Sequence, residues 1–257
     1  MTRHVKIAID AGILTLTLAR AEKKNALTNG MYGALADALE QAEGNPAIRV
    51  VLIRAEGESF TAGNDIGEFA AQASGRIDGV PEVMRFLHAL AHASRPLVAA
   101  VQGHAVGVGT TMLLHCDVVL LAEDARLSTP FVSLALVPEA AASLLLPQRI
   151  GHPRAFAMFA LGQVVDAATA LAWGLANQVV PSGDLHHAAH DMAVRLAGQP
   201  AQAMAATKRL MRDAATLSAR IDVEGVRFAE QLRSPEAREA FAAFAERRAP
   251  DFTKIAG

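Results

Sequence analysis

The stretch that decides the fold is Leu97-Val98-Ala99-Ala100-Val101, followed after Gln102 by Gly103-His104-Ala105-Val106-Gly107-Val108-Gly109-Thr110-Thr111. Its first part is a continuous apolar run, which is typical of a β-strand buried on both faces. Its second part is rich in small residues and predicts a turn that opens a helix. Small residues let a ligand approach the backbone, and amide groups there can bind a developing negative charge. This stretch therefore predicts a buried strand that ends in a candidate site.

The same pattern recurs along the chain. A second apolar run at residues 50–53 is followed by a glycine-bearing turn at residues 59–66. Residues 13–18 alternate apolar and polar side chains as in a half-buried strand, and residues 118–121 form another apolar run. Residues 28–43 predict a helix that Thr28 or Asn29 caps. This order predicts an α/β fold with crossover connections.

The pattern changes near residue 187, beyond which no strand signal remains. We expect two or three amphipathic helices over residues 187–246, broken near residues 198–200 and 234–235. The predicted division is a core at residues 1–186 and a helical region at residues 187–257. Such a region either assembles subunits or completes the core of the monomer, and the sequence alone leaves both open.

Composition narrows the class of protein. The chain has 257 residues, 52% of them apolar, and a formal charge of −2. It is too apolar for a disordered protein, and the balanced charge argues against nucleic acid or an anionic membrane as partner. A single cysteine excludes an internal disulfide, and the nine histidines have no metal-ligand spacing, so no metal is expected. Without a signal-peptide core or a run long enough to cross a bilayer, we expect a cytoplasmic protein.

The two glycine-bearing turns could together hold one oxyanion from two directions, or they could be tight turns with packing glycines. Spacing alone does not decide between these interpretations. Gly107-Val108-Gly109 lacks the third glycine of a dinucleotide fingerprint and the Gly-Lys-Ser/Thr ending of a phosphate loop. Neither nucleotide motif is therefore present here.

Four segments, in order and with matching spacing over residues 5–257, resemble signature segments of the enoyl-CoA hydratase/isomerase (crotonase) superfamily. They are Glu22-Lys23-Lys24-Asn25-Ala26-Leu27, then Phe60-Thr61-Ala62-Gly63-Asn64-Asp65-Ile66, then residues 99–109 with His115-Cys116-Asp117, and finally residues 168–180. The resemblance implies a spiral of ββα turns and a C-terminal helical region that builds a homotrimer or a dimer of trimers. It also implies an acyl-CoA thioester as ligand, so that coenzyme A enters with the substrate and no separate cofactor is needed.

By this resemblance, the backbone amides of Asn64 and Val108 bind the thioester oxygen as it becomes an enolate. Val108 stands where relatives carry glycine, so the amide is kept while a branched side chain is added. The resemblance also implies a set of substrate-binding residues: Lys23, Lys24, Ala26, Ala62, Gly63, Asn64, Asp65, Ile66, Thr111 and Phe131.

The acid/base groups decide which reaction follows. Thr111 and Phe131 occupy the positions of the two glutamates of family hydratases, and neither can take up a proton near neutral pH. Glu139 is the only charged residue between Arg126 and Arg149, and burial there would raise its pKa into the range of a general base. Alternatively, Glu139 lies in the first turn of a helix that begins at Pro138 and stabilises the helix dipole.

The arrangement around Glu139 resembles the Δ3,Δ2-enoyl-CoA isomerase branch of the family, whose catalytic glutamate occupies this position. Three interpretations therefore remain. The first is an isomerase that uses Glu139 as its only proton shuttle. The second is a hydratase or another lyase in which Glu139 and a water replace the missing pair. The third is a non-catalytic acyl-CoA-binding protein.

Overall fold

Strands and crossover helices alternate in the computed structural model, which describes residues 2–68 and 81–255. Six strands form one sheet in the order β1-β2-β3-β4-β6-β9, in which β1 and β2 are antiparallel and the other pairs are parallel. The strands are β1 (Val5–Asp10), β2 (Ile13–Leu18), β3 (Val50–Ala55), β4 (Leu97–Val101), β6 (Val118–Ala122) and β9 (Gln178–Val180). The α/β fold with crossover connections is confirmed.

A second sheet has the order β5 (His104–Val106), β7 (Arg126–Ser128) and β8 (Val165–Asp166). β5 and β7 follow β4 and β6 after short turns, so that two successive chain segments each contribute one strand to each sheet before a helix begins. This repeated strand–strand–helix order is the expected ββα spiral.

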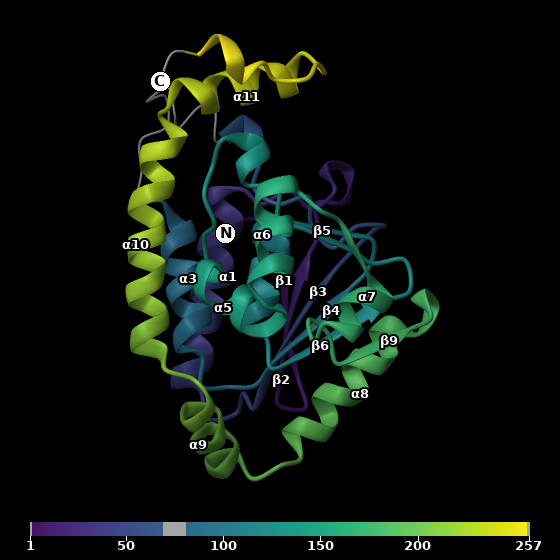
Figure 1. Cartoon of the computed structure of the whole chain (residues 1–257). Helices are drawn as coiled ribbons and strands as arrows, with labels where there is room; N and C mark the ends of the chain where they lie inside the picture. Colours follow the sequence, from purple (N-terminus) through teal and green to yellow (C-terminus); the bar gives the residue numbers. More distant parts are fainter. Residues whose placement is uncertain (1, 69–80, 256–257) are drawn as a thin grey trace.

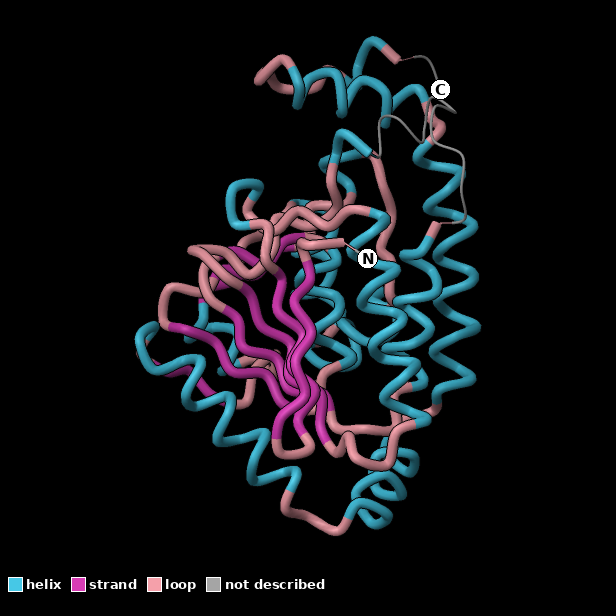
Figure 2. Tube along the Cα trace, turned by 180° about the vertical axis from the view of Figure 1, so that it is seen from behind, coloured by secondary structure: helices cyan, strands magenta, loops and turns pink. Residues whose placement is uncertain are grey.

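The large sheet is buried on both faces. Alternate residues of β3 divide between two core clusters, with Val51 and Ile53 on one face and Val50 and Leu52 on the other. Helices α1 (Asn29–Gly44) and α3 (Glu82–His92) cover the first face, and α10 (Ala214–Leu232) lies outside α3 (Figure 1). Helix α8 (Leu185–Ala197) crosses the second face (Figure 2). The hydroxyl of Thr28 caps α1, as the sequence predicts.

The remaining helices are α4 (Val108–Thr111), α5 (Ala142–Ile150), α6 (His152–Leu161), α7 (Ala167–Ala172), α9 (Ala201–Met211) and α11 (Pro235–Ala245). Short 3-10 segments are η1 (Ala21–Lys23), η2 (Met112–His115), η3 (Val132–Leu134), η4 (Ser182–Asp184) and η5 (Phe252–Lys254). None of the helices in the described ranges is long and apolar enough to cross a membrane.

The C-terminal part holds four helices, α8 to α11, so the prediction of two or three is wrong. The breaks near residues 198–200 and 234–235 are confirmed. The missed break lies at Arg212, which is extended, and Asp213, whose carboxylate accepts the N–H groups of Ala215 and Thr216. An aspartate cap of this kind begins a new helix without any glycine or proline in the sequence.

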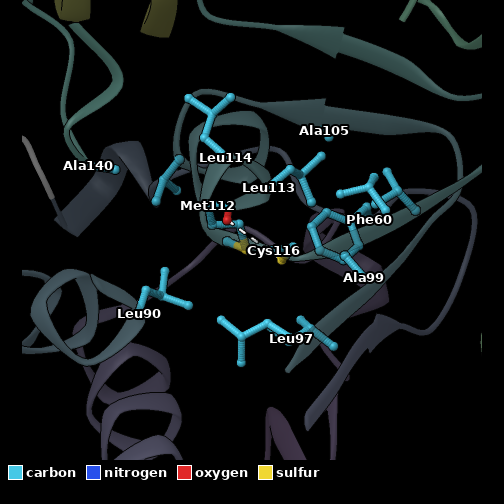
Figure 3. Close-up of a cluster of buried hydrophobic side chains, with 14 of the residues drawn as sticks. Phe60, Leu90, Leu97, Ala99, Ala105, Met112, Leu113, Leu114, Cys116 and Ala140 are labelled. Carbon is cyan, nitrogen blue, oxygen red and sulfur yellow. Dashed lines mark hydrogen bonds between the residues drawn. The ribbon is translucent and has the colours of Figure 1, made fainter. Parts of the chain in front are cut away.

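Cys116 lies inside the core, where its thiol donates a hydrogen bond to the carbonyl oxygen of Met112 (Figure 3). Burial raises the pKa of this thiol to about 12, which keeps it protonated and unreactive. Ala140 borders the same apolar cluster, so the chain next to Glu139 rests directly on the core.

Candidate active site

The turn after β3 pairs with the second sheet. Thr61 donates its N–H to the carbonyl oxygen of His104, and Val106 donates to the carbonyl oxygen of Thr61. Gly63 has a φ of +88°, and a Cβ there would lie 2.9 Å from the carbonyl oxygen of Val106. Only glycine combines this backbone conformation with this close approach.

The turn after β5 lies directly against it. Gly107 has a φ of +57°, and a Cβ on Gly109 would lie 2.4 Å from Cγ2 of Thr61. Val108 itself is the first residue of α4, and its side chain is buried in the core. The branched side chain is accommodated because the positive φ falls on Gly107, whereas Val108 lies in the helix. The structure thus brings the two glycine-bearing turns together.

Several backbone N–H groups beside those of Asn64 and Val108 are already hydrogen-bonded. Gly63 donates its N–H to Oγ1 of Thr61, Asp65 donates to the carbonyl oxygen of Leu27, and Gly107 donates to that of Ser128. Within the described ranges, the N–H groups of Asn64 and Val108 have no such hydrogen-bond partner. A bound acceptor could therefore use both without displacing an existing bond.

Two cavities meet at Glu139 and Phe228. The loop-side cavity, of about 60 Å³, is lined by Ala62, Gly63, Asn64, Ile66, Val106, Gly107, Pro130, Phe131, Leu134, Leu136, Glu139 and Phe228. The helix-side cavity, of about 110 Å³, is lined by Pro81, Val83, Met84, Leu87, Glu139, Ala140, Ile221, Gly225, Phe228, Ala229 and Leu232. Among the described residues, Glu139 is the only ionisable one that lines either cavity. A larger cavity of about 290 Å³, beside Arg149, Lys208 and Arg212, shares no residue with them.

Glu139 is a buried carboxylate, 6% exposed, and its Oε1 has no hydrogen-bond partner among the described residues. Burial, together with the negative charge of Glu224, raises the pKa of Glu139 to about 8. The side chain of Asn64, which donates a hydrogen bond to this carboxylate, acts in the opposite direction. A carboxyl group with this pKa can both accept and release a proton near neutral pH.

The alternative interpretation of Glu139 as a helix-dipole residue is wrong. Helix α5 begins at Ala142, so Glu139 and Pro138 both precede it. The carboxylate that meets the start of α5 belongs to Glu224 of α10, whose Oε1 accepts the N–H of Ser143 at 2.9 Å. Glu139 does not cap this helix and instead lines both cavities.

The turn after Glu139 contains Ala140 and Ala141, both in the left-handed conformation at φ values of +63° and +54°. Each such residue costs on the order of 1 kcal/mol. His115 supports the turn, because its Nε2 lies 2.7 Å from the carbonyl oxygen of Ala140. A guanidinium N–H of Arg212 donates to Nδ1 of His115, which places the ring proton on Nε2, and burial lowers the pKa of His115 to about 3. The ring is therefore a neutral donor.

Tyr32, Glu224 and Phe228 belong to the site, although sequence analysis missed them. The hydroxyl of Tyr32 donates to Oδ1 of Asn64, so the Asn64 side chain lies between Tyr32 and Glu139. Tyr32 is the only tyrosine of the chain, but it lies in an ordinary amphipathic helix. Glu224 and Phe228 lie in a long charged helix, where no local signal separates them from surface residues.

The structure separates the remaining predicted residues into groups. Ala62, Gly63, Asn64, Ile66 and Phe131 line the loop-side cavity, whereas Thr111 is fully buried and lines neither cavity. Asp65 forms an ion pair with Arg20 at 2.7 Å, and its pKa is lowered.

Lys23 and Lys24 are exposed on a turn that contacts the loop of residues 62–66, because Ala62 donates its N–H to the carbonyl oxygen of Lys24. Ala26 follows on the same turn and is partly buried.

Comparison with known proteins defines the class. The sequence profile of the Enoyl-CoA hydratase/isomerase family matches residues 8–255, so the chain belongs to this family. It is 34% identical to the 1,2-epoxyphenylacetyl-CoA isomerase of Escherichia coli K12 over 98% of this chain and 99% of that one. It is 32% identical to the 2,3-dehydroadipyl-CoA hydratase of the same organism over 93% and 94%. A crystal structure of an enoyl-CoA hydratase/isomerase from Pseudoalteromonas atlantica T6c matches with a TM-score of 0.92 at 42% identity, covering 97% of this chain and 100% of that one.

Proposed function

We propose that this protein is an enoyl-CoA isomerase, which moves the double bond of an acyl-CoA thioester from C3 to C2. The single observation that carries the proposal is Glu139, a buried carboxylate that lines both cavities and has a pKa of about 8. One of its oxygens has no hydrogen-bond partner in the part of the chain that the structure describes. Family membership supports a thioester as substrate, and one relative is named as an acyl-CoA isomerase.

The reaction needs two proton transfers and no water. The N–H groups of Asn64 and Val108 bind the thioester oxygen, which lowers the energy of the enolate that forms when a proton leaves C2. Glu139 takes that proton, the electron pair of the broken C–H bond spreads over the dienolate, and Glu139 returns the proton to C4. The double bond then lies between C2 and C3, and the carboxylate is regenerated.

The surroundings of Glu139 suit an acyl chain. The helix-side cavity is lined by Val83, Met84 and Leu87 of the α3 segment and by apolar residues of α10. We place the acyl chain in this cavity and the thioester in the loop-side cavity. Lys23, Lys24 and the backbone of residues 62–66 then bind the coenzyme A moiety, whose phosphates are suitable partners for the lysine cations.

Hydration of 2-enoyl-CoA is the second candidate, because a relative is named as a hydratase. Hydration needs one group to activate water and another to protonate C2, and the two positions of the hydratase glutamates hold Thr111 and Phe131. Thr111 lines neither cavity, so it is not placed to activate a water there.

Parallel assays with a 3-enoyl-CoA and a 2-enoyl-CoA substrate test the proposal. We expect the 3-enoyl substrate to be converted to the 2-enoyl product, with little formation of 3-hydroxyacyl-CoA from the 2-enoyl substrate. Rapid hydration without isomerisation would favour the hydratase. Binding of both substrates without turnover would favour a non-catalytic acyl-CoA-binding protein.

A further inference from the structure

Helix α10 places a second carboxylate against the turn that carries Glu139. Glu224 is 6% exposed, and its Oε1 accepts the N–H of Ser143 at 2.9 Å and interacts with the N–H of Ala141. Its neighbours on the helix, Ile221, Gly225 and Phe228, line the same cavity as Glu139. The face of α10 that carries Glu224 is therefore packed on the catalytic turn.

Each of the two carboxylates keeps one buried oxygen without a hydrogen-bond partner within the described residues: Oε1 of Glu139 and Oε2 of Glu224. A neutral oxygen, such as that of an amide side chain, would be sufficient to accept the N–H groups of the turn. A carboxylate adds a buried negative charge, and two carboxylates in one buried site cannot both ionise easily. Capping the start of α5 therefore does not explain why this position carries a charged side chain.

We propose that Glu224 is a positioning residue for Glu139: its Oε1 holds the turn of residues 139–143, and its negative charge opposes the ionisation of Glu139. The catalytic consequence rests on the proposed function, because opposing ionisation makes Glu139 a stronger base towards the C2 proton of the thioester. The effect of Glu224 on the proton affinity of Glu139 does not depend on catalysis, because it can be measured in the folded protein without a substrate.

The groups around the pair are consistent with this assignment. Glu139 faces Tyr32 of α1, which is neutral because its own pKa is raised, and the amide of Asn64. Burial raises the pKa of Glu224, and the opposing effects of its hydrogen bonds with Ser143 and Ala141 and of the charge of Arg220 do not outweigh it. After burial, Glu224 is the largest cause of the high pKa of Glu139.

The kinetic test is the pH profile of kcat/KM for isomerisation. Glu224→Gln keeps an oxygen acceptor for Ser143 but removes the charge, so we expect the acidic limb of the profile to move about one pH unit lower. Glu230→Gln, at an exposed position on the same helix, is the matched control and should leave the profile unchanged.

Glu224→Asp keeps the negative charge on a shorter side chain. Its pH profile should have the acidic limb of the wild type, and its kcat should be lower. The proposal would be contradicted if the acidic limb of the Glu224→Gln profile stayed at the wild-type pH. It would also be contradicted if the acidic limb of the Glu224→Asp profile moved to lower pH.

Equilibrium unfolding at fixed protein concentration gives a readout that needs no activity. A carboxyl group with a raised pKa holds its proton more tightly in the folded than in the unfolded protein. The free energy of unfolding of the wild type should therefore fall as the pH rises from about 4.5 to about 8. Because the pKa of Glu224 is itself raised, Glu224 adds its own share to this fall, and the pairing is measured by a double-mutant cycle. Glu224→Gln should make the fall shallower by more in the wild-type background than in a Glu139→Gln background, and Glu230→Gln should leave the fall unchanged. Equal reductions in the two backgrounds would overturn the pairing. If the reduction is larger in the wild-type background but the wild type lacks isomerase activity, the pairing stands and the proposed function is rejected.

Discussion

Glu139 owes its environment to side chains that lie far from it in the sequence. Asn64 comes from the turn after β3, Glu224 from α10 and His115 from η2, and each contacts either the Glu139 carboxylate or the turn that carries it. Burial disfavours the charged form of Glu139 and raises its pKa. The charge of Glu224 raises this pKa further, and the hydrogen bond from Asn64 lowers it. At the scale of single residues, the site is therefore a carboxyl group whose proton affinity is set by its partners.

Glu139→Gln tests the role of the carboxylate directly. Glutamine keeps the shape of the side chain but cannot accept a proton, so turnover of 3-enoyl-CoA should fall by at least about 10²-fold. Because glutamine also avoids the burial of a charge, the variant should be no less stable than the wild type at pH 8, as measured by urea unfolding. Acyl-CoA affinity, measured by calorimetry, should stay within a few-fold. Isomerisation at the wild-type rate would eliminate Glu139 as the base.

Asn64→Ala separates the backbone role of this residue from that of its side chain. The N–H group remains, so acyl-CoA affinity should change little. The hydrogen bond that lowers the pKa of Glu139 is lost, so the acidic limb of the pH profile should move to higher pH. Tyr32→Phe removes the hydroxyl that orients the Asn64 amide and should shift the limb in the same direction by a smaller amount. An unchanged limb in both variants would show that the Asn64 side chain has no influence on Glu139.

At the scale of elements, the site depends on how closely two turns approach. β5 pairs with the turn after β3 through Thr61 and Val106, and the glycines of both turns lie where a side chain would collide. The N–H groups of Gly63, Asp65 and Gly107 beside Asn64 and Val108 are already hydrogen-bonded in this packing.

Gly63→Ala should therefore damage both stability and activity. The added Cβ meets the carbonyl oxygen of Val106 at 2.9 Å on a backbone with a φ of +88°. Strain of this kind costs on the order of 1–3 kcal/mol, which thermal or urea unfolding can detect. Gly183→Ala is the matched control, because a Cβ there meets no atom within 4 Å, and its stability should match that of the wild type. Equal stability of the two variants would refute the close-approach argument.

At the scale of the whole molecule, the C-terminal helices leave apolar side chains uncovered. Leu210 and Met211 at the end of α9 are more than four-fifths exposed, and Val223 and Val226 on α10 are more than half exposed. Exposed apolar side chains on neighbouring helices are typical of surfaces that other subunits cover. We propose that this region assembles the homotrimer or dimer of trimers that the family resemblance implies.

Light scattering on the purified chain checks this assembly. The mass should be three or six times the 27.0 kDa of one chain at micromolar concentration. Val226→Asp places a charge on the exposed apolar face of α10 and should shift the distribution towards smaller species, whereas Glu230→Gln on the same helix should not. A wild-type protein that remains a monomer under these conditions would contradict the proposal.

The sequence by itself determined four strands of the large sheet, the two glycine-bearing turns and the isolation of Glu139 in an apolar stretch, because these features are local in the chain. It did not show β1, β9 or the second sheet, whose strands are short or exposed. Only the tertiary structure decided that Glu139 precedes α5, that Glu224 meets the start of that helix, and that Asn64 lies between Tyr32 and Glu139. The extra break at Asp213 was also missed, since aspartate is common on helix surfaces and becomes a cap only where the backbone is extended before it. Burial and proton affinity depend on contacts between distant segments, and such contacts arise only when the chain is packed.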